Sequence, residues 1–219
     1  MEKEIIITNV ERKMLNDFKP FVPKPQKFIP MFNGKIFEVG AAAISNYDVH
    51  TIFGGSMQMG MRRCIEKGTL TLISNTYIIK DSLRYAKKNR YYYDRWKGDT
   101  FEYTGMGLRG DQSLDFMQNK TLCKSNERCK SNEREDDNKS SDFMQNKTPC
   151  KSKDNANNNT EVEVHVFEVL TPGNYTYRGW FYLADKPFPE IQKDMNGQER
   201  KAWVFPLRRV KQDFPELDK

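Results

Sequence analysis

Residues 87–97 are rich in basic and aromatic side chains. Their sequence is Lys87-Lys88-Asn89-Arg90-Tyr91-Tyr92-Tyr93-Asp94-Arg95-Trp96-Lys97. Guanidinium and ammonium groups neutralise phosphates, and aromatic faces stack on bases, so this stretch suits a nucleic-acid ligand. The same residues also fit a tyrosine-rich strand with solvated flanks. The stretch alone does not separate these two interpretations.

A glycine-rich turn begins at Tyr103, nine residues after Asp94. Residues 103–110 read Tyr-Thr-Gly-Met-Gly-Leu-Arg-Gly and lead into Asp111-Gln112-Ser113-Leu114. Three glycines in six residues resemble a phosphate cradle. However, the run lacks the Gly-Lys-Ser/Thr sequence of a P-loop and the spacing of a dinucleotide-binding loop. Taken by itself, the turn is weak evidence.

The composition limits the class of protein. The chain of 219 residues has a net charge of +6 and a mean hydropathy of −0.83, a basic balance that fits a polyanionic partner without proving one. The N-terminus lacks the features of a signal peptide, and no apolar run reaches membrane-spanning length. The four cysteines form no Cys-x-x-Cys pair, so neither a zinc site nor a disulfide framework is expected. We expect a cytoplasmic, reduced protein without a membrane segment.

The elements that would position these residues are mostly strands. Alternating and β-branched runs predict strands at 35–39, 69–73, 101–103, 162–169, 175–183 and 201–207. Residues 111–122 have a weak helical pattern, a glycine-marked turn is expected at 53–55, and residues 187–197 are expected to form a loop. Four prolines make residues 20–33 extended and loop-like, so we expect residues 1–33 to be a lead-in and the folded domain to begin at Gly34. The pattern predicts an α+β fold that is mainly β.

The polar part of the chain contains an internal duplication. Residues 115–121, Asp-Phe-Met-Gln-Asn-Lys-Thr, recur 27 residues later at 142–148. Two copies are too few to bury the core of a solenoid, so a tandem duplication in a tolerant loop is the better interpretation. Because this composition cannot offset the entropy of ordering, we expect residues 124–160 to be a mobile insertion. We expect the first copy to occupy the helix site, because it directly continues the preceding strand.

Taken together, the order of these features resembles the SRA (SET- and RING-associated, or YDG) domain. The resemblance rests on the Tyr-Thr-Gly-x-Gly turn at 103–107, the Asp111-Gln112 segment that continues to Leu122, the acidic residue in the tyrosine-rich loop, the strand at 164–169 and the closing residues 203–209. It is closest to bacterial SRA-like domains found ahead of HNH nuclease domains in modification-dependent restriction enzymes. It implies a PUA-like twisted β-barrel with one or two flanking helices over residues 34–210, followed by a tail at 211–219.

The resemblance also implies roles for individual residues in a pocket that holds a flipped-out modified cytosine. Tyr103 matches one stacking aromatic, and Thr104, with Gly105 beside it, matches the residue that frames the base edge. Tyr91 matches the second stacking aromatic, with Tyr92 or Tyr93 as alternatives if the loop shifts. Asp94 matches the carboxylate that reads the base. The chemistry is consistent, because a carboxylate accepts from the N4 amino group of cytosine and repels the O4 acceptor of thymine.

One departure from the family pattern concerns the loop that fills the gap left by the flipped base. Here that loop is only Met106 to Gly110, so the orphan-base contacts are expected elsewhere, in the His50–Phe53 loop or at Gln58 and Met59. The expected contacts to the DNA backbone and the orphan base together are His50, Gln58, Arg62, Arg63, Lys88, Arg90, Lys97 and Arg109. The short loop leaves the preference for hemimodified or fully modified sites open.

No catalytic arrangement is recognisable in the chain. Its two histidines, His50 and His165, lie 115 residues apart, too few and too far apart to indicate an HNH, Cys-His or Ser-His-Asp site. We therefore expect no catalytic residues, no metal and no cofactor. The expected partner is double-stranded DNA with modified cytosine, with an HNH-type nuclease domain or subunit and a homodimer as open alternatives. The competing interpretation is a PUA-like barrel that binds RNA or a ligand without reading cytosine modification, and a structural scaffold is the third.

Overall fold

The computed structural model describes residues 3–19, 26–76, 92–125 and 162–211. Within them, the larger of two sheets has eight strands. Its order is β3-β4-β7-β8-β10-β6-β5, and β9 pairs with β10. Its strands are β3 (Met61–Cys64), β4 (Thr69–Ser74), β5 (Arg95–Lys97), β6 (Thr100–Thr104), β7 (Glu163–Thr171), β8 (Asn174–Leu183), β9 (Phe188–Lys193) and β10 (Glu199–Arg209). The β4–β7 pair is parallel, and the other pairs are antiparallel.

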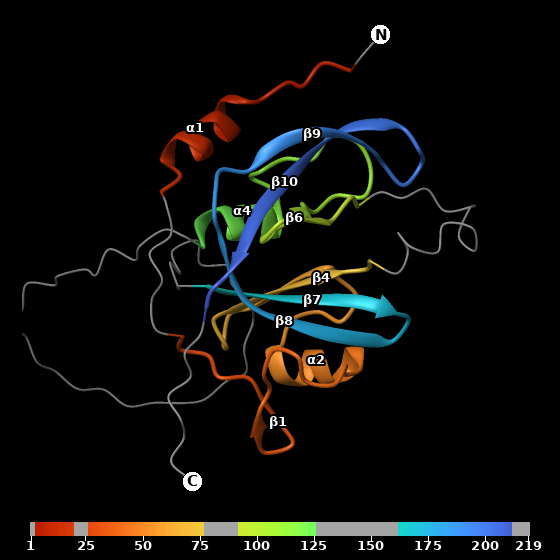
Figure 1. Cartoon of the computed structure of the whole chain (residues 1–219). Helices are drawn as coiled ribbons and strands as arrows, with labels where there is room; N and C mark the ends of the chain where they lie inside the picture. Colours follow the sequence, from red (N-terminus) through yellow and green to blue (C-terminus); the bar gives the residue numbers. More distant parts are fainter. Residues whose placement is uncertain (1–2, 20–25, 77–91, 126–161, 212–219) are drawn as a thin grey trace, which may run out of the picture.

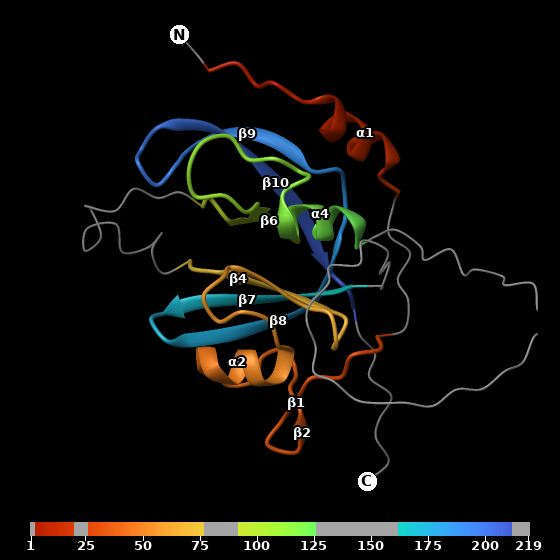
Figure 2. The same ribbon diagram turned by 180° about the vertical axis from the view of Figure 1, so that it is seen from behind.

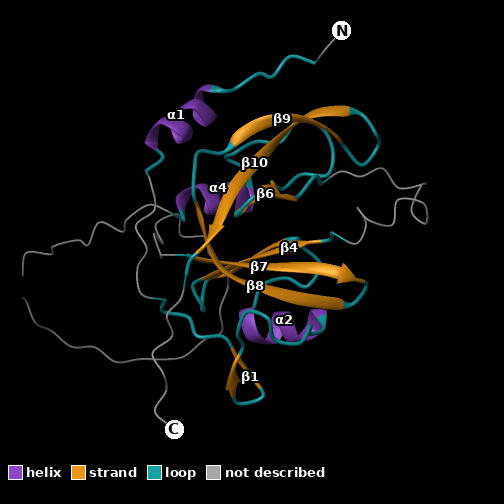
Figure 3. Ribbon diagram, in the orientation of Figure 1, coloured by secondary structure: helices purple, strands orange, loops and turns teal. Residues whose placement is uncertain are grey.

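The sheet bends back over itself into two layers (Figures 1 and 3). The layer of β4, β7 and most of β8 faces the layer of β6, β9 and β10, and the end of β8 crosses over to pair with β10 at Leu183↔Leu207. The main hydrophobic core lies between the layers and contains Leu72, Val166 and Trp203. Burial of this core removes apolar surface from water and holds the layers together.

Three helices of the described residues pack against this sheet. The described helices are α1 (Asn9–Asp17), α2 (Asn46–Phe53) and α4 (Met117–Lys124), and a small hairpin joins β1 (Met31–Phe32) to β2 (Lys35–Ile36). Figure 2 shows α2 against the layer of β7 and β8, and α1 and α4 beside the other layer. A second core lies under α2, where Phe53 packs on Phe167 of β7 with ring centroids 5.1 Å apart. Both faces of β7 are therefore buried.

Side chains connect parts of the sheet that no backbone pairing joins. The Tyr103 hydroxyl of β6 donates to the Gly60 and Ile73 carbonyls at 3.2 and 3.4 Å, which ties β6 to the opposite layer. Trp96 of β5 donates to Glu168 of β7 at 3.1 Å. Among the described residues the strand pairing is an open path, and these side-chain contacts join its two layers.

The structure confirms the predicted mainly β, α+β fold and most of its strands. The predicted strands at 69–73, 101–103, 162–169, 175–183 and 201–207 correspond to β4, β6, β7, β8 and β10. The turn predicted at 53–55 follows α2, with Gly54 at φ 76° and a Cβ position only 2.5 Å from the Cys64 sulfur. That backbone angle and that close contact both require glycine.

Other local predictions were wrong. The predicted loop at 187–197 contains β9, and the strand predicted at 35–39 ends at Ile36. The helix predicted from residue 111 begins at Met117. Before it, the Gln112 side chain donates to the Gly105 carbonyl and the Ser113 carbonyl accepts from Asn119, so these residues form a turn. The first copy of the duplication forms α4, as predicted. The second copy, almost all of the expected insertion at 124–160 and residues 212–219 of the tail lie outside the described residues.

None of the described helices is long and apolar enough to cross a membrane.

The N-terminal segment is packed against the barrel rather than leading up to it. A capping box begins α1, in which Thr8 and Glu11 exchange side-chain and backbone hydrogen bonds. Met14, Leu15 and Phe18 then pack against the main core. The sequence-based boundary at Gly34 leaves this helix outside the domain, whereas the structure places it within the packed body.

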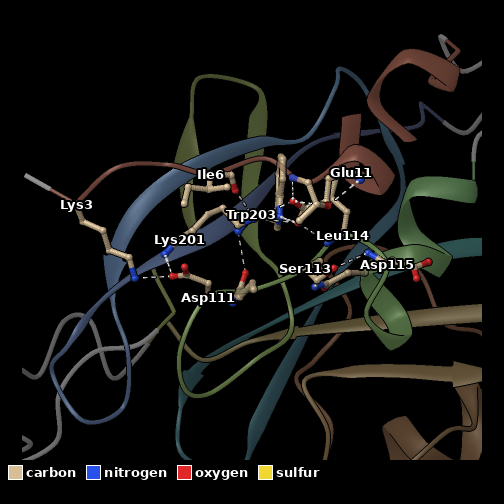
Figure 4. Close-up of polar contacts among 12 residues, drawn as sticks. Lys3, Ile6, Glu11, Asp111, Ser113, Leu114, Asp115, Lys201 and Trp203 are labelled. Atoms are coloured by element: carbon tan, nitrogen blue, oxygen red, sulfur yellow. Dashed lines mark hydrogen bonds and ion pairs between the residues drawn. The ribbon is translucent and has the colours of Figure 1, made fainter. Parts of the chain in front are cut away.

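Glu11 is the centre of a buried polar cluster (Figure 4). Its side chain is fully buried and accepts from Lys201 Nζ at 2.8 Å, Trp203 Nε1 at 2.9 Å and the Leu114 amide at 3.3 Å. Lys201 Nζ also donates to the Ile6 carbonyl at 2.9 Å. A buried charge is stable only when it is paired and hydrogen-bonded, and here one carboxylate connects α1, β10 and the segment before α4.

We expect Glu11→Ala to lower the free energy of unfolding by about 3–5 kcal/mol, because it leaves the Lys201 ammonium buried without its counter-charge. Urea unfolding at neutral pH measures the change. Glu4→Ala is the control, since Glu4 is exposed and should change stability by less than about 0.5 kcal/mol. A Glu11→Leu, Lys201→Met double variant should be more stable than Glu11→Leu alone. Equal effects of Glu4→Ala and Glu11→Ala would contradict the role of the cluster.

The same cluster predicts a pH dependence of stability. Burial by itself raises the pKa of Glu11, but the hydrogen bonds from Lys201, Thr8 and Trp203 outweigh it and hold the pKa below its usual 4.5. A group with a lowered folded-state pKa contributes stability that is complete above its unfolded pKa and is lost as the pH falls through the folded value. Stability should therefore fall as acid is added below about pH 4.5. Glu11→Gln should flatten this part of the curve, and an unchanged slope would argue against it.

Candidate nucleic-acid interface

The turn at 103–107 is held in place by two buried amide side chains. Gln112 Nε2 donates to the Gly105 carbonyl at 2.7 Å, and Gln112 Oε1 accepts from the Trp203 amide at 2.8 Å. Asn119 of α4 accepts from the Met106 amide at 2.6 Å and donates to the Met106 and Ser113 carbonyls. These bonds satisfy backbone groups of the turn after β6 that no strand pairing satisfies. The Asp-Gln motif and the following Asn therefore fix the shape of the glycine turn.

Gly105 itself is required by close packing. A Cβ at this position would lie 2.9 Å from both Asn119 Oδ1 and the Phe205 ring, and 3.1 Å from Gln112 Oε1. Its amide donates to the Trp203 carbonyl at 2.7 Å, so the backbone cannot easily move away. Any larger residue would displace the two amides that hold the turn.

Asp94 and Thr104 lie side by side at the end of β6. Asp94 is buried, and its Oδ1 accepts from the Thr104 amide at 2.8 Å. The Tyr93 amide in turn donates to Thr104 Oγ1 at 3.0 Å. These two bonds align residues 93 and 94 with the end of β6, just beyond the β5–β6 pairing. A carboxylate is thereby fixed in orientation next to the glycine turn.

Tyr103 belongs to the main core as well as to this site. It is 4% exposed, and its ring centroid lies 6.2 Å from that of Phe101. Burial raises the pKa of Tyr103 well above its usual value, and the neighbouring Asp94 and Tyr92 raise it further, whereas Arg62 lowers it. The phenol is therefore neutral and serves as a hydrogen-bond donor to the opposite layer. The structure brings Tyr92, Asp94, Tyr103 and Thr104 together, while Tyr91 lies outside the described residues.

The predicted contacts to the DNA backbone and the orphan base divide into two groups. Arg62 is buried and donates to the Met59 and Met57 carbonyls, Arg63 donates to the Cys64 and Thr69 carbonyls, and His50 Nδ1 is 2.5 Å from the Gly55 carbonyl. Arg62 and His50 therefore brace the loop between α2 and β3, and Arg63 braces the β3–β4 hairpin. Arg62 is buried, and the other two side chains are half-buried. Gln58, Lys97 and Arg109 are exposed, with Lys97 80% exposed. Lys88 and Arg90 lie outside the described residues.

Two residues important to this site carried no sequence signal. Arg200 of β10 is fully buried and donates to the Gly107 carbonyl. Asp194, in the turn after β9, accepts from the Gly110 amide at 3.3 Å. Both contacts brace the loop at 106–110 from strands far along the chain. A charged residue in a strand or turn gives no local sign that it is buried. Only the fold therefore shows the roles of Arg200 and Asp194.

Comparison with known proteins finds similarity to SRA domains. Residues 39–134 match the sequence model of the ScoMcrA-like SRA domain family. This match covers the tyrosine-rich loop, the glycine turn and the Asp-Gln segment, and it confirms the predicted resemblance to SRA domains. A search of curated proteins found no match.

Three solved structures are similar at low sequence identity. The type IV phosphorothioation-dependent restriction endonuclease ScoMcrA has 14% identity and a TM-score of 0.48 over 82% of this chain. The sulfur-binding and SRA domains of ScoMcrA complexed with phosphorothioated DNA have 14% identity and a TM-score of 0.49 over 82%. KRYPTONITE in complex with mCHH DNA has 17% identity and a TM-score of 0.47 over 96%. This chain spans 29%, 42% and 37% of those chains, respectively.

We expect Asn119→Ala to destabilise the protein by about 2–4 kcal/mol, because it opens a cavity at a fully buried side chain and leaves the half-buried Met106 and Ser113 backbone groups without their partner. Thermal and urea unfolding measure the loss. Lys120→Ala on the same helix is the control, because Lys120 is exposed and makes only a surface ion pair with Asp115. It should change stability by less than about 0.5 kcal/mol. Similar losses for both variants would mean that Asn119 does not hold the turn.

Proposed function

We propose that the chain binds duplex DNA containing a modified cytosine and holds the flipped base at Asp94 and Thr104. The observation that carries this proposal is the buried Asp94 carboxylate, fixed by the Thr104 amide within residues that match an SRA family. The intact duplex conceals much of the edge of a base. Base flipping brings that edge against protein groups.

The chemistry of Asp94 suits a cytosine edge. One carboxylate oxygen accepts from Thr104, which fixes the plane of the group. A carboxylate has acceptor capacity for more than one donor, so it can also accept from the N4 amino group of a flipped cytosine. Thymine offers an acceptor at the same position and would be repelled. The tyrosines at 91–93 would supply the aromatic surface on which the base stacks. Tyr103, which the sequence assigns to stacking, is buried in the main core and supports the site from inside the fold.

The remaining affinity would come from phosphate contacts. The chain carries a net charge of +6, and Lys97 and Arg109 are exposed cations, with Lys88 and Arg90 as further candidates in sequence. Such contacts are independent of sequence and weaken with salt. We infer a reader rather than a catalyst, acting within a modification-dependent restriction or defence system. An HNH-type nuclease domain or subunit, a homodimer and a cytoplasmic location belong to the same proposal.

We expect Asp94→Asn to abolish the preference for modified duplex, lowering the ratio of affinities for modified and unmodified DNA by about tenfold or more. The amide can still accept from Thr104, but its NH₂ group opposes the N4 donor of the flipped base. Modified duplex should then bind only through the phosphate contacts that also hold unmodified duplex. Fluorescence anisotropy with matched duplexes containing cytosine, 5-methylcytosine, 5-hydroxymethylcytosine or a bulkier modification measures the ratio. The salt-dependent background should remain.

Asp99→Asn is the matched control, because it makes the same charge change at an exposed position in the turn between β5 and β6. It should leave the ratio unchanged. A wild-type protein that ignored cytosine modification, and whose DNA binding was competed well by single-stranded RNA, would favour the PUA-like RNA-binding alternative and end this proposal. Equal loss of modified and unmodified binding in Asp94→Asn would assign Asp94 a folding role instead.

A further inference from the structure

The tyrosine-rich loop and the glycine turn are joined a second time, away from Asp94 and Thr104. The guanidinium of Arg200 lies over the Tyr92 ring, with its central carbon 5.9 Å from the ring centroid. The same guanidinium donates through Nη1 to the Gly107 carbonyl. Tyr92 is two residues before Asp94, and Gly107 is three residues after Thr104. Arg200 therefore bridges the two segments that form the candidate pocket.

The position of Arg200 is fixed by its surroundings. It is fully buried on β10, opposite Gln192 of β9. Burial lowers its pKa, while Tyr92, Asp194, Tyr93 and Asp111 nearby favour the charged form. Asp194 also accepts from the Asn196 and Gln198 amides, and the Met195 amide donates to the Leu108 carbonyl at 3.1 Å. The turn after β9 thus supports the loop that Arg200 binds.

The type of residue suits this bridging role. A guanidinium is planar, remains charged and can stack on an aromatic ring while one of its N–H groups donates elsewhere. A lysine ammonium is a compact charge and cannot cover the ring in the same way. Methionine would fill a similar volume but would lose both the charge and the donor. The site therefore requires the shape of arginine as well as its charge.

We propose that Arg200 is a positioning residue for the modified-base pocket, which sets the separation of the Tyr92 and Gly107 sides before DNA binds. This inference rests on the proposed function and goes beyond it by assigning discrimination to a residue outside the pocket. An aromatic wall held at a fixed distance favours one base size and lowers the entropy lost on binding. Without the bridge, the loop could move, and the pocket would accept modified and unmodified bases more equally.

The test compares affinities for modified and unmodified duplexes in Arg200→Met, Arg200→Lys, Tyr92→Leu and Tyr92→Phe. We expect Arg200→Met and Tyr92→Leu each to lower the ratio of affinities about tenfold, Arg200→Lys to recover it in part and Tyr92→Phe to retain it. The Arg200→Met, Tyr92→Leu double variant should lose no more than the larger single loss, because both remove the same contact. Arg208→Met, at the exposed end of β10, is the control for the lost charge and should retain the wild-type ratio.

Thermal unfolding first establishes that each variant is folded at the assay temperature. If Arg200→Met is unfolded, Tyr92→Leu against Tyr92→Phe still tests the contact. An unchanged ratio in folded Arg200→Met or Tyr92→Leu, or additive losses in the double variant, would overturn the proposal. A wild-type protein without any preference for modified DNA would instead overturn the proposed function, so the two failures are distinguishable.

Discussion

The buried carboxylate of Glu11 is the interaction on which the rest of the structure most depends. Removing a charged carboxylate from water is costly, so its oxygens must be met by donors from Lys201, Trp203, Thr8 and Leu114. Meeting that requirement fixes the N-terminal helix, the middle of β10 and the segment before α4 relative to one another. Few other arrangements of these three segments would satisfy the same atoms.

The candidate pocket is built on this fixed region. Asp111 accepts from the Lys201 amide at 2.7 Å, and the next residue, Gln112, joins Trp203 to Gly105. The glycine turn is thus held by bonds that lead back to the same stretch of β10 as the Glu11 cluster. Rigid support of this kind keeps a binding site in its productive shape before the ligand arrives. The loop at 106–110 gains its order from strands, although it has little structure of its own.

Tyr103 and Asp94 both hold the fold together at the place proposed for recognition. The Tyr103 hydroxyl ties the two layers of the barrel, and its ring contributes to the core. The Asp94 carboxylate accepts a hydrogen bond from the backbone amide of Thr104, which lies beside it in space. If Asp94 reads the base as proposed, a change at this position affects both stability and recognition. Measurements that compare two ligands on one variant separate the effects, since folding alters both affinities together.

The sequence by itself determined the features that depend on local pattern. Alternation predicted β7, β8 and β10, and the order of the tyrosine-rich loop, the glycine turn and the Asp-Gln segment predicted the SRA resemblance that the family match confirms. Only the tertiary structure decided which charges are buried. Glu11 and Lys201 are 190 residues apart in sequence and read as surface residues until the fold brings them together. Arg62, predicted as a contact to the DNA backbone, lies inside the fold, as does Arg200. Burial depends on contacts between distant segments, and no local pattern records it.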